Sequence, residues 1–162
     1  MSLFDRRSIV LGFAALASAC GFEPVYAPGS VATRLRNSIL VDPPSDPVGF
    51  ELVNELERRF GEPTAARYRL TANIAVEEDD IGVTADQEIT RFRLRGRVDY
   101  SVLDPATDAP LTSGQAQSFT TYSATSTTVA TRSAKRDAER RLMVILADQI
   151  VTRLSTTAET WA

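Results

Sequence analysis

The sequence predicts an α+β fold in which two helices pack on one face of a small, mostly antiparallel four-stranded sheet. Two neighbouring segments alternate apolar and polar residues, as half-buried strands do. Two other segments repeat apolar residues at helical spacing. The elements follow the order strand, helix, three strands and helix. A sheet with one apolar face under two helices therefore satisfies the layer rule for a single domain.

The first half of the domain is expected to hold a short strand and a helix. Residues 34–41, RLRNSILV, alternate weakly and then become apolar, which predicts a strand that ends at the breaker cluster DPPSDP. Asp46 is placed to cap a helix with Pro47 in its first turn, and Gly61 is placed to end it. Apolar residues at helical spacing predict the helix itself over residues 48–60.

The two central strands have the clearest patterns. In RYRLTANIAVE, residues 67–77, the apolar side chains occupy even positions, whereas Ile81 and Val83 are odd, which predicts a bulge. RFRLRGRVDYSV, residues 91–102, places apolar side chains on one face and arginines on the other. Gly96 falls on the apolar face, where we expect a helix to approach closely.

The second half of the domain is predicted to contain one more strand and the longest helix. A polar connection over residues 104–114 leads to a strand at 115–123. The helix begins between residues 127 and 131 and runs to about residue 154. Its expected buried stripe is Ala134, Ala138, Leu142, Ile145, Leu146, Gln149, Ile150 and Leu154. The single domain spans residues 31–156, and residues 157–162 are expected to be a frayed tail.

Residues 1–19 have the features of a signal peptide, and residues 20–30 those of a tether. Arg6 and Arg7 precede an uncharged apolar run that is too short to span a bilayer. Small residues lead to Cys20, the only cysteine, as in a bacterial lipoprotein signal. We expect acyl chains on Cys20 and no other cofactor. The signal is imperfect, because the usual leucine three positions before the cysteine is alanine. The alternative is therefore a secreted protein with a free thiol at Cys20. The pair Arg6 and Arg7 also leaves open whether export uses the twin-arginine or the general route.

The composition excludes several classes of function. The chain has 162 residues, no histidine and one cysteine, so a Ser/His/Asp or Cys/His catalytic set and an intrachain disulfide are impossible. A formal net charge of −3 gives no overall attraction to nucleic acid. The acidic run at 77–80 lacks the spacing of a calcium loop and predicts a solvated turn or an arginine partner. We therefore expect a protein that is not an enzyme, binds no metal and has no nucleic-acid partner.

Three stretches resemble the LptE family of lipopolysaccharide-assembly lipoproteins. They are CGFEPVY at 20–26, SFTTYSATSTTVATRSAKRDA at 118–138 and LADQIVTRL at 146–154, and they occur together with the family's order of elements. The resemblance implies a lipid-anchored protein on the periplasmic side of the outer membrane. It also implies that the protein plugs and helps to assemble a β-barrel partner of the LptD type, and takes part in lipopolysaccharide transport without catalysing a reaction.

Arginines are the first candidate contact residues. Side chains on one face of a strand recur about every 6.6–6.8 Å, so several guanidinium groups could hold the phosphates of lipopolysaccharide. The alternatives are cross-strand pairing with acidic residues, solvation, or contact with the barrel. The candidates are Arg91, Arg93, Arg95 and Arg97 in one row, with Arg67 and Arg69 on the preceding strand.

Hydroxyl-bearing and aromatic residues before the last helix are the candidates for barrel contact. The stretch 112–133 is rich in Ser and Thr, which suits the polar lumen of an outer-membrane barrel. An ordinary edge strand and loop would have a similar composition. The candidate contact residues are Phe119, Thr120, Thr121 and Tyr122.

Two rival functions stay open at this level. One is a different periplasmic lipoprotein that serves as an accessory factor for cell-wall synthesis or for an ABC transport system. The other is a secreted hydrolase with a carboxylate site, although nothing in the sequence selects a pair of carboxylates for acid–base catalysis.

Overall fold

The computed structural model describes residues 29–44, 46–83, 89–124 and 127–162. The leader, Cys20 and most of the expected tether lie outside these residues. The described chain forms the following elements: α2 (Val31–Leu35), β1 (Ile39–Val41), α3 (Pro47–Phe60), β2 (Tyr68–Val83), β3 (Ile89–Leu103), β4 (Pro110–Ser123), α4 (Thr128–Thr157) and the 3₁₀ helix η1 (Ala158–Thr160).

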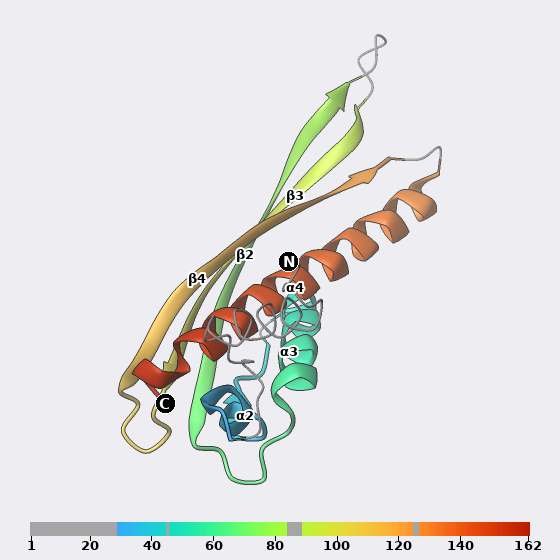
Figure 1. Ribbon diagram of the computed structural model, residues 1–162. Coiled ribbons are helices and arrows are strands. Elements are labelled where there is room, and N and C mark those ends of the chain that lie inside the picture. The colour runs from blue at the N-terminus through green and yellow to red at the C-terminus, as the bar shows by residue number, and fades with distance from the viewer. Residues whose placement is uncertain (1–28, 45, 84–88, 125–126) are drawn as a thin grey trace, which may run out of the picture.

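The sheet has the strand order β1-β2-β3-β4, and the helices lie on one side of it (Figure 1). β2, β3 and β4 are antiparallel neighbours, whereas β1 runs parallel to β2. The α+β class and the helix-covered sheet are thus confirmed, and the sheet is mixed rather than purely antiparallel. The β2–β3 hairpin extends beyond the end of β4 at the upper end of the molecule in Figure 1.

The first predicted strand is largely wrong. Residues 31–35 form α2, where the Ser30 hydroxyl accepts a hydrogen bond from the Thr33 N–H at 3.2 Å, and only Ile39–Val41 form β1. Asn37 adopts a φ of 55°, in the left-handed region that asparagine tolerates better than most residues. This turn reverses the chain between α2 and β1, so the weak alternation of residues 34–41 does not continue as one strand.

Helix α3 begins and ends where the sequence predicts. The Asp46 carboxylate accepts a hydrogen bond from the Gly49 N–H at 2.7 Å, and Pro47 occupies the first helical position. Gly61 ends the helix with a φ of 80°, a conformation that favours glycine. Leu52, Leu56 and Phe60 are buried on one side.

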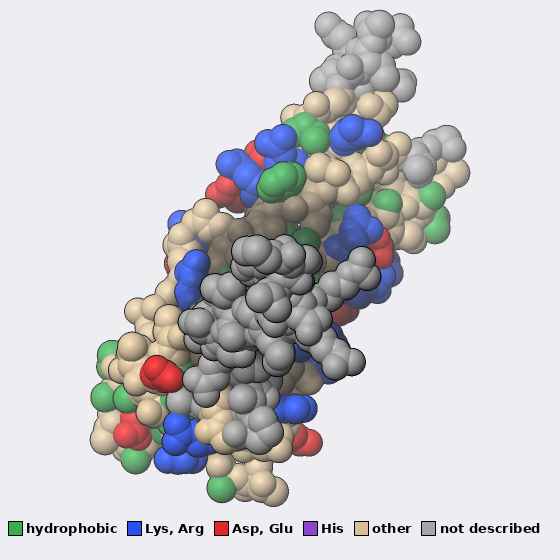
Figure 2. Space-filling view, in the orientation of Figure 1, with side chains coloured by type: hydrophobic (Ala, Val, Ile, Leu, Met, Phe, Trp, Pro, Cys, Tyr) green, Lys and Arg blue, Asp and Glu red, His purple; other side chains and the backbone are tan. Residues whose placement is uncertain are grey.

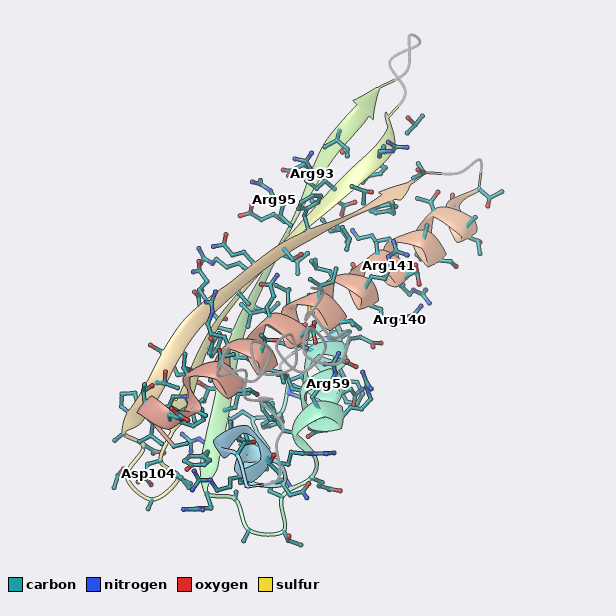
Figure 3. The ribbon with its side chains drawn as sticks, in the orientation of Figure 1. Arg59, Arg93, Arg95, Asp104, Arg140 and Arg141 are labelled. Atoms are coloured by element: carbon teal, nitrogen blue, oxygen red, sulfur yellow. The ribbon has the colours of Figure 1, made fainter. Side chains whose placement is uncertain are left out.

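The predicted bulge in β2 is also confirmed. Asp80 pairs with Phe92 and Gly82 pairs with Arg91, so Ile81 is the extra residue. The connection before β4 is shorter than expected, because β4 begins at Pro110 and the loop covers only residues 104–109. The Asp104 carboxylate, in the loop labelled in Figure 3, accepts a hydrogen bond from the Ala106 N–H and holds this turn.

Helix α4 lies along the sheet and contributes more buried core residues than any other described element. Its buried residues include Ala138, Leu142, Leu146, Ile150 and Leu154, as the predicted stripe requires. Ile145 and Gln149 of that stripe are instead exposed, and Met143, Ala147 and Val151 are buried. The difference arises because α4 packs against α3 as well as against the sheet, which a single-sided stripe does not anticipate.

The C-terminal tail differs from the frayed segment that the sequence suggests. Ala158 in η1 is buried, and the Trp161 ring packs edge-on against Tyr68 with ring centroids 5.3 Å apart. The Trp161 indole N–H also donates a hydrogen bond to the Thr157 hydroxyl. These contacts join the end of the chain to the start of β2.

At Gly96, α4 comes close to β3. A Cβ atom built on Gly96 would lie 2.8 Å from Leu146 Cδ1 and 2.9 Å from Leu142 Cδ2. Both leucines are fully buried, so their methyl groups have little room to move.

We expect Gly96→Val to lower the free energy of unfolding by about 1–3 kcal/mol or more, because it overpacks the contact between β3 and α4. The measurement is urea unfolding followed by circular dichroism. The control is Ser101→Val, on the opposite face of β3, which should change the value by less than about 0.5 kcal/mol. Equal effects of the two variants would contradict this description of the core.

Candidate functional site

The sheet face away from the helices, here called the open face, carries the odd-numbered residues of β3 and β4 and those of β2 before its bulge. The register aligns three cross-strand rows on this face: Ala75–Arg97–Gln117, Glu77–Arg95–Phe119 and Asp79–Arg93–Thr121. The even-numbered residues of β3 and β4 point toward α4, with Leu94, Val98 and Ala116 buried there. The alternation of β3 and β4 thus separates a helix-covered apolar side from a bare, charged side.

Carboxylates on the open face neutralise part of the arginine row. The Arg95 guanidinium contacts the Asp79 carboxylate at 2.8 Å and the Glu77 carboxylate at 3.2 Å. Arg97 pairs with Asp99 at 3.2 Å on the same strand. The predicted arginine partner for the acidic run 77–80 is thus present. These side chains are about half exposed, so each pair adds little to stability but balances like charges along the strand.

Arg91 and Arg93 form no ion pair with any residue that the structure describes. The Arg93 guanidinium lies 5.6 Å from the centroid of the Phe119 ring, a cation–π arrangement. Its Nε atom is buried and has no hydrogen-bond partner among the described residues. Figure 3 labels Arg93 and Arg95 beside each other on the upper sheet, and Figure 2 shows basic, acidic and hydrophobic side chains together there.

A shallow groove runs across this part of the open face. Its lining includes Glu77, Arg95, Arg97, Gln117 and Phe119. A second hollow lies further down the same face and is lined mainly by hydroxyl and amide side chains, among them Thr71, Asn73, Ser101, Ser113 and Gln115. The alternating arginines of β3 predicted the charged upper part, whereas the lower part, in which Asp99 is the one charged residue of the lining, has no run of charges that could have singled it out.

Arg67 and Arg69 do not extend the arginine row. Although β2 and β3 are neighbours, their antiparallel register places Arg69 opposite Leu103. The β2 residue opposite Arg97 is Ala75, which lies six residues further along β2. That separation corresponds to about 20 Å along a strand. Arg69 instead pairs with Asp108 at 2.9 Å and with Asp42 at 3.8 Å, and its Nε atom has no hydrogen-bond partner within the described chain.

The four barrel-contact candidates divide between the two sheet faces. Phe119 is 61% exposed and Thr121 is exposed, both on the open face. Thr120 and Tyr122 point toward α4: the Thr120 hydroxyl donates a hydrogen bond to the Ala138 carbonyl, and Tyr122 is only 7% exposed. Neither side chain is available to a partner in this conformation. Residues at odd and even positions of a strand cannot share a face, and this rule already separates Phe119 from Tyr122.

Tyr122 belongs to a polar cluster that joins the β2–β3 hairpin to α4. Its ring stacks on Phe92, with centroids 5.0 Å apart, and its hydroxyl donates a hydrogen bond to the Glu78 carboxylate. The Lys135 ammonium, from α4, donates to the other oxygen of the same carboxylate. Burial and the neighbouring Glu78 raise the pKa of Tyr122, so its hydroxyl keeps the proton that it donates.

Glu78 is held ionised by these two partners. Burial alone would raise the pKa of its carboxyl, but the hydrogen bonds from Lys135 and Tyr122 outweigh burial and lower the pKa below its usual value of 4.5. On the exposed side of α4, the Asp137 carboxylate pairs with Arg140 and Arg141, which are labelled in Figure 3. Within the described segments, no group of three or more acidic or cysteine side chains could hold a metal ion.

A comparison with known sequence families gives one match, and no curated protein matches the chain significantly. The model of the LptE family, described as lipopolysaccharide-assembly, matches residues 36–154. This range contains β1 to β4, α3 and nearly all of α4, so it covers the whole open face and the helices behind it.

Solved structures with the same fold include lipoproteins from Caulobacter, Shewanella and Nitrosomonas. A candidate lipoprotein from Caulobacter crescentus CB15 is 28% identical, with a TM-score of 0.64 over 80% of this chain and 96% of its own. Rare lipoprotein B from Shewanella oneidensis is 14% identical, with a TM-score of 0.56 over 74% and 93%. Uncharacterized lipoprotein B from Nitrosomonas europaea is 15% identical, with a TM-score of 0.60 over 86% and 93%. The last two likenesses establish the fold alone.

We expect the Glu78 cluster to make stability depend on pH. Because folding lowers the pKa of Glu78, its contribution is present at pH values above the unfolded pKa and disappears as the pH falls through the folded pKa. Between about pH 6 and pH 3, the free energy of unfolding should therefore fall more steeply in the natural protein than in Glu78→Gln. Urea unfolding across this range measures both slopes. Glu51→Gln, at an exposed position of α3, should keep the natural slope, and identical slopes for all three proteins would contradict the cluster's role.

Proposed function

The chain belongs to the LptE family of lipopolysaccharide-assembly lipoproteins, and we propose that it plugs the lumen of an LptD-type β-barrel in the outer membrane. In this role it helps the barrel to assemble and takes part in the insertion of lipopolysaccharide. The proposal assigns it binding and positioning but no chemical step.

The observation that carries this proposal is the bare, polar sheet face. A plug needs a rigid body with a polar outer surface, because the lumen of an outer-membrane barrel is lined by polar side chains. The helices cover one side of the sheet and build the core, while the open face presents arginines, carboxylates, hydroxyls and amides. Phe119 and Thr121 are the open-face members of the barrel-contact set.

The upper part of the open face also suits the phosphates of lipopolysaccharide. Arg91 and Arg93 have no acidic partner among the described residues, so they are the members of the arginine row with free charge. Phe119 lies beside Arg93 and offers an apolar surface next to the cation. Arg95 and Arg97 already contact carboxylates, so a phosphate must compete for them.

Acylation of Cys20 would hold this domain at the membrane. Several acyl chains give stable anchoring where one does not, and tethering raises the effective concentration near a membrane partner. None of the helices in the described parts of the chain is both long enough and apolar enough to cross a membrane. The proposed location is the periplasmic side of the outer membrane.

The direct test is isolation of the protein from membranes in mild detergent through an affinity tag. We expect a large β-barrel protein to be recovered in about equal amount, since a plug binds one barrel. Depletion of the protein should in addition lower the amount of lipopolysaccharide at the cell surface. Recovery of peptidoglycan synthases or ABC-transport components in place of a barrel would contradict the proposed function and favour an accessory lipoprotein.

We expect the unpaired arginines to matter more for lipid A than the paired ones. Arg91→Gln with Arg93→Gln should weaken binding of phosphorylated lipid A sugars about tenfold or more, because charge-assisted hydrogen bonds to phosphate are lost. The matched control, Arg95→Gln with Arg97→Gln, should weaken it less. Calorimetric titration of the folded variants measures both. An unchanged affinity in the first variant would rule out this phosphate site.

A further inference from the structure

The outer edge of β4 has hydrogen-bonding groups that the sheet does not use. The strand has no neighbour beyond it in the described sheet. Two arginines of α4 reach this edge: Arg153 donates to the Gln115 carbonyl at 2.6 Å and Arg141 donates to the Thr121 carbonyl at 3.3 Å. Because main-chain groups alternate in direction along a strand, the N–H and C=O groups of Gln117 and Phe119 point to the same edge.

A ridge of α4 runs alongside this edge. Arg141, Ile145, Gln149 and Arg153 are spaced four residues apart and therefore lie in one row on the helix. The row covers about 18 Å at the helical rise. The six-residue interval from Thr121 to Gln115 covers about 20 Å along β4. The two arginines thus reach the strand edge at both ends of this row, and Ile145 and Gln149 lie between them in the row; the strip between the row and the edge of β4 is called the slot below.

In the middle of the slot, main-chain groups of β4 lack hydrogen-bond partners among the described residues. No hydrogen bond from a described residue outside the sheet reaches the main chain of Gln117 or Phe119. Ile145, which the apolar spacing of α4 predicts to be buried, is 39% exposed. A strand added beside β4 would pair with these main-chain groups and place a side chain over Ile145.

We infer that an extended segment of a protein partner pairs with β4 along residues 115–121, with an apolar side chain over Ile145 and an acidic side chain near Arg153. The inference rests on the proposed function, in that the partner is the β-barrel protein. Charge complementarity selects an acidic side chain at the Arg153 end, since Arg153 forms no ion pair with a described residue, whereas the Arg141 guanidinium already contacts the Asp137 carboxylate. Unpaired edges otherwise attract other chains, and the two arginines restrict access to this one.

A second copy of the chain fits this edge poorly. In an antiparallel pair of β4 strands centred on Ser118, Gln115 of one copy would lie opposite Thr121 of the other. Arg153 of each copy would then face Arg141 of its partner, and like charges opposite each other destabilise strand pairing. The edge therefore favours a segment of a different protein.

The test uses the full lipidated protein, isolated from membranes in mild detergent together with the barrel. Gln117→Pro removes the outward N–H without touching the bonds to β3, and the proline ring obstructs pairing at this edge. We expect about tenfold less barrel to be recovered with Gln117→Pro than with the natural protein. Gln117→Ala is the matched control, because it removes the same side chain but keeps the outward N–H, so barrel recovery with it should stay severalfold above that with Gln117→Pro.

A second variant pair tests the apolar part of the slot without changing the strand. Ile145→Gln should also lower recovery severalfold, whereas Val144→Gln, an equally exposed neighbour outside the ridge, should not. Hydrogen exchange of the complex should show the amides of Gln117 and Phe119 exchanging at least about tenfold more slowly than in the free protein. Circular dichroism confirms that each variant is folded.

Three outcomes would overturn the inference. The first is equal barrel recovery with Gln117→Pro and with the natural protein, together with unchanged hydrogen exchange at Gln117 and Phe119. This result would show that the partner does not pair with β4, and it would not contradict the proposed function. Protection of these amides in a dimer of the chain, without a barrel, would assign the edge to a second copy. If no barrel protein is recovered with the natural protein, both the proposed function and this inference are contradicted.

Discussion

The close approach of α4 to β3 at Gly96 determines which surfaces of the molecule are free. Only a residue without a side chain lets Leu142 and Leu146 lie against the strand, and this contact fixes α4 along the even-numbered side of the sheet. Since side chains alternate along each strand, covering one side leaves the odd-numbered residues of β3 and β4, and those of β2 before its bulge, on the other. The bare polar face is therefore a direct consequence of how the core is built.

Charge balance on that face is local rather than global. Carboxylates from β2 and β3 contact Arg95 and Arg97, whereas Arg93 rests on the Phe119 ring and keeps its charge unpaired within the described chain. A surface of this kind is polar enough for the lumen of a barrel, and among its described residues the arginines without an acidic partner are Arg91 and Arg93. The outer edge of β4, the last strand of this face, lies beside the row of α4 residues from Arg141 to Arg153, and both arginines donate hydrogen bonds to it.

Local sequence signals predicted the ends and bends of individual elements better than they predicted how the elements pack against one another. The caps of α3, the bulge at Ile81 and the close approach at Gly96 each depend on one or two residues, and all three are confirmed. The short α2 and β1 were not separable from a weak strand pattern, because a turn at Asn37 leaves few residues on either side. The exposure of Ile145 depends on how α4 divides its contacts between α3 and the sheet. The spacing of apolar residues along the helix does not predict this division.

The use of the open face can be measured most directly by cysteine labelling in envelope membranes. Thr121→Cys places a thiol on this face, and Thr152→Cys places one on an exposed position of α4. If the open face meets the barrel, maleimide should label Thr121→Cys at least about tenfold more slowly in membranes than in the purified free protein, and Thr152→Cys should change less. Equal labelling rates of Thr121→Cys in membranes and in free solution would show that this face stays bare in the cell and would contradict the proposed role.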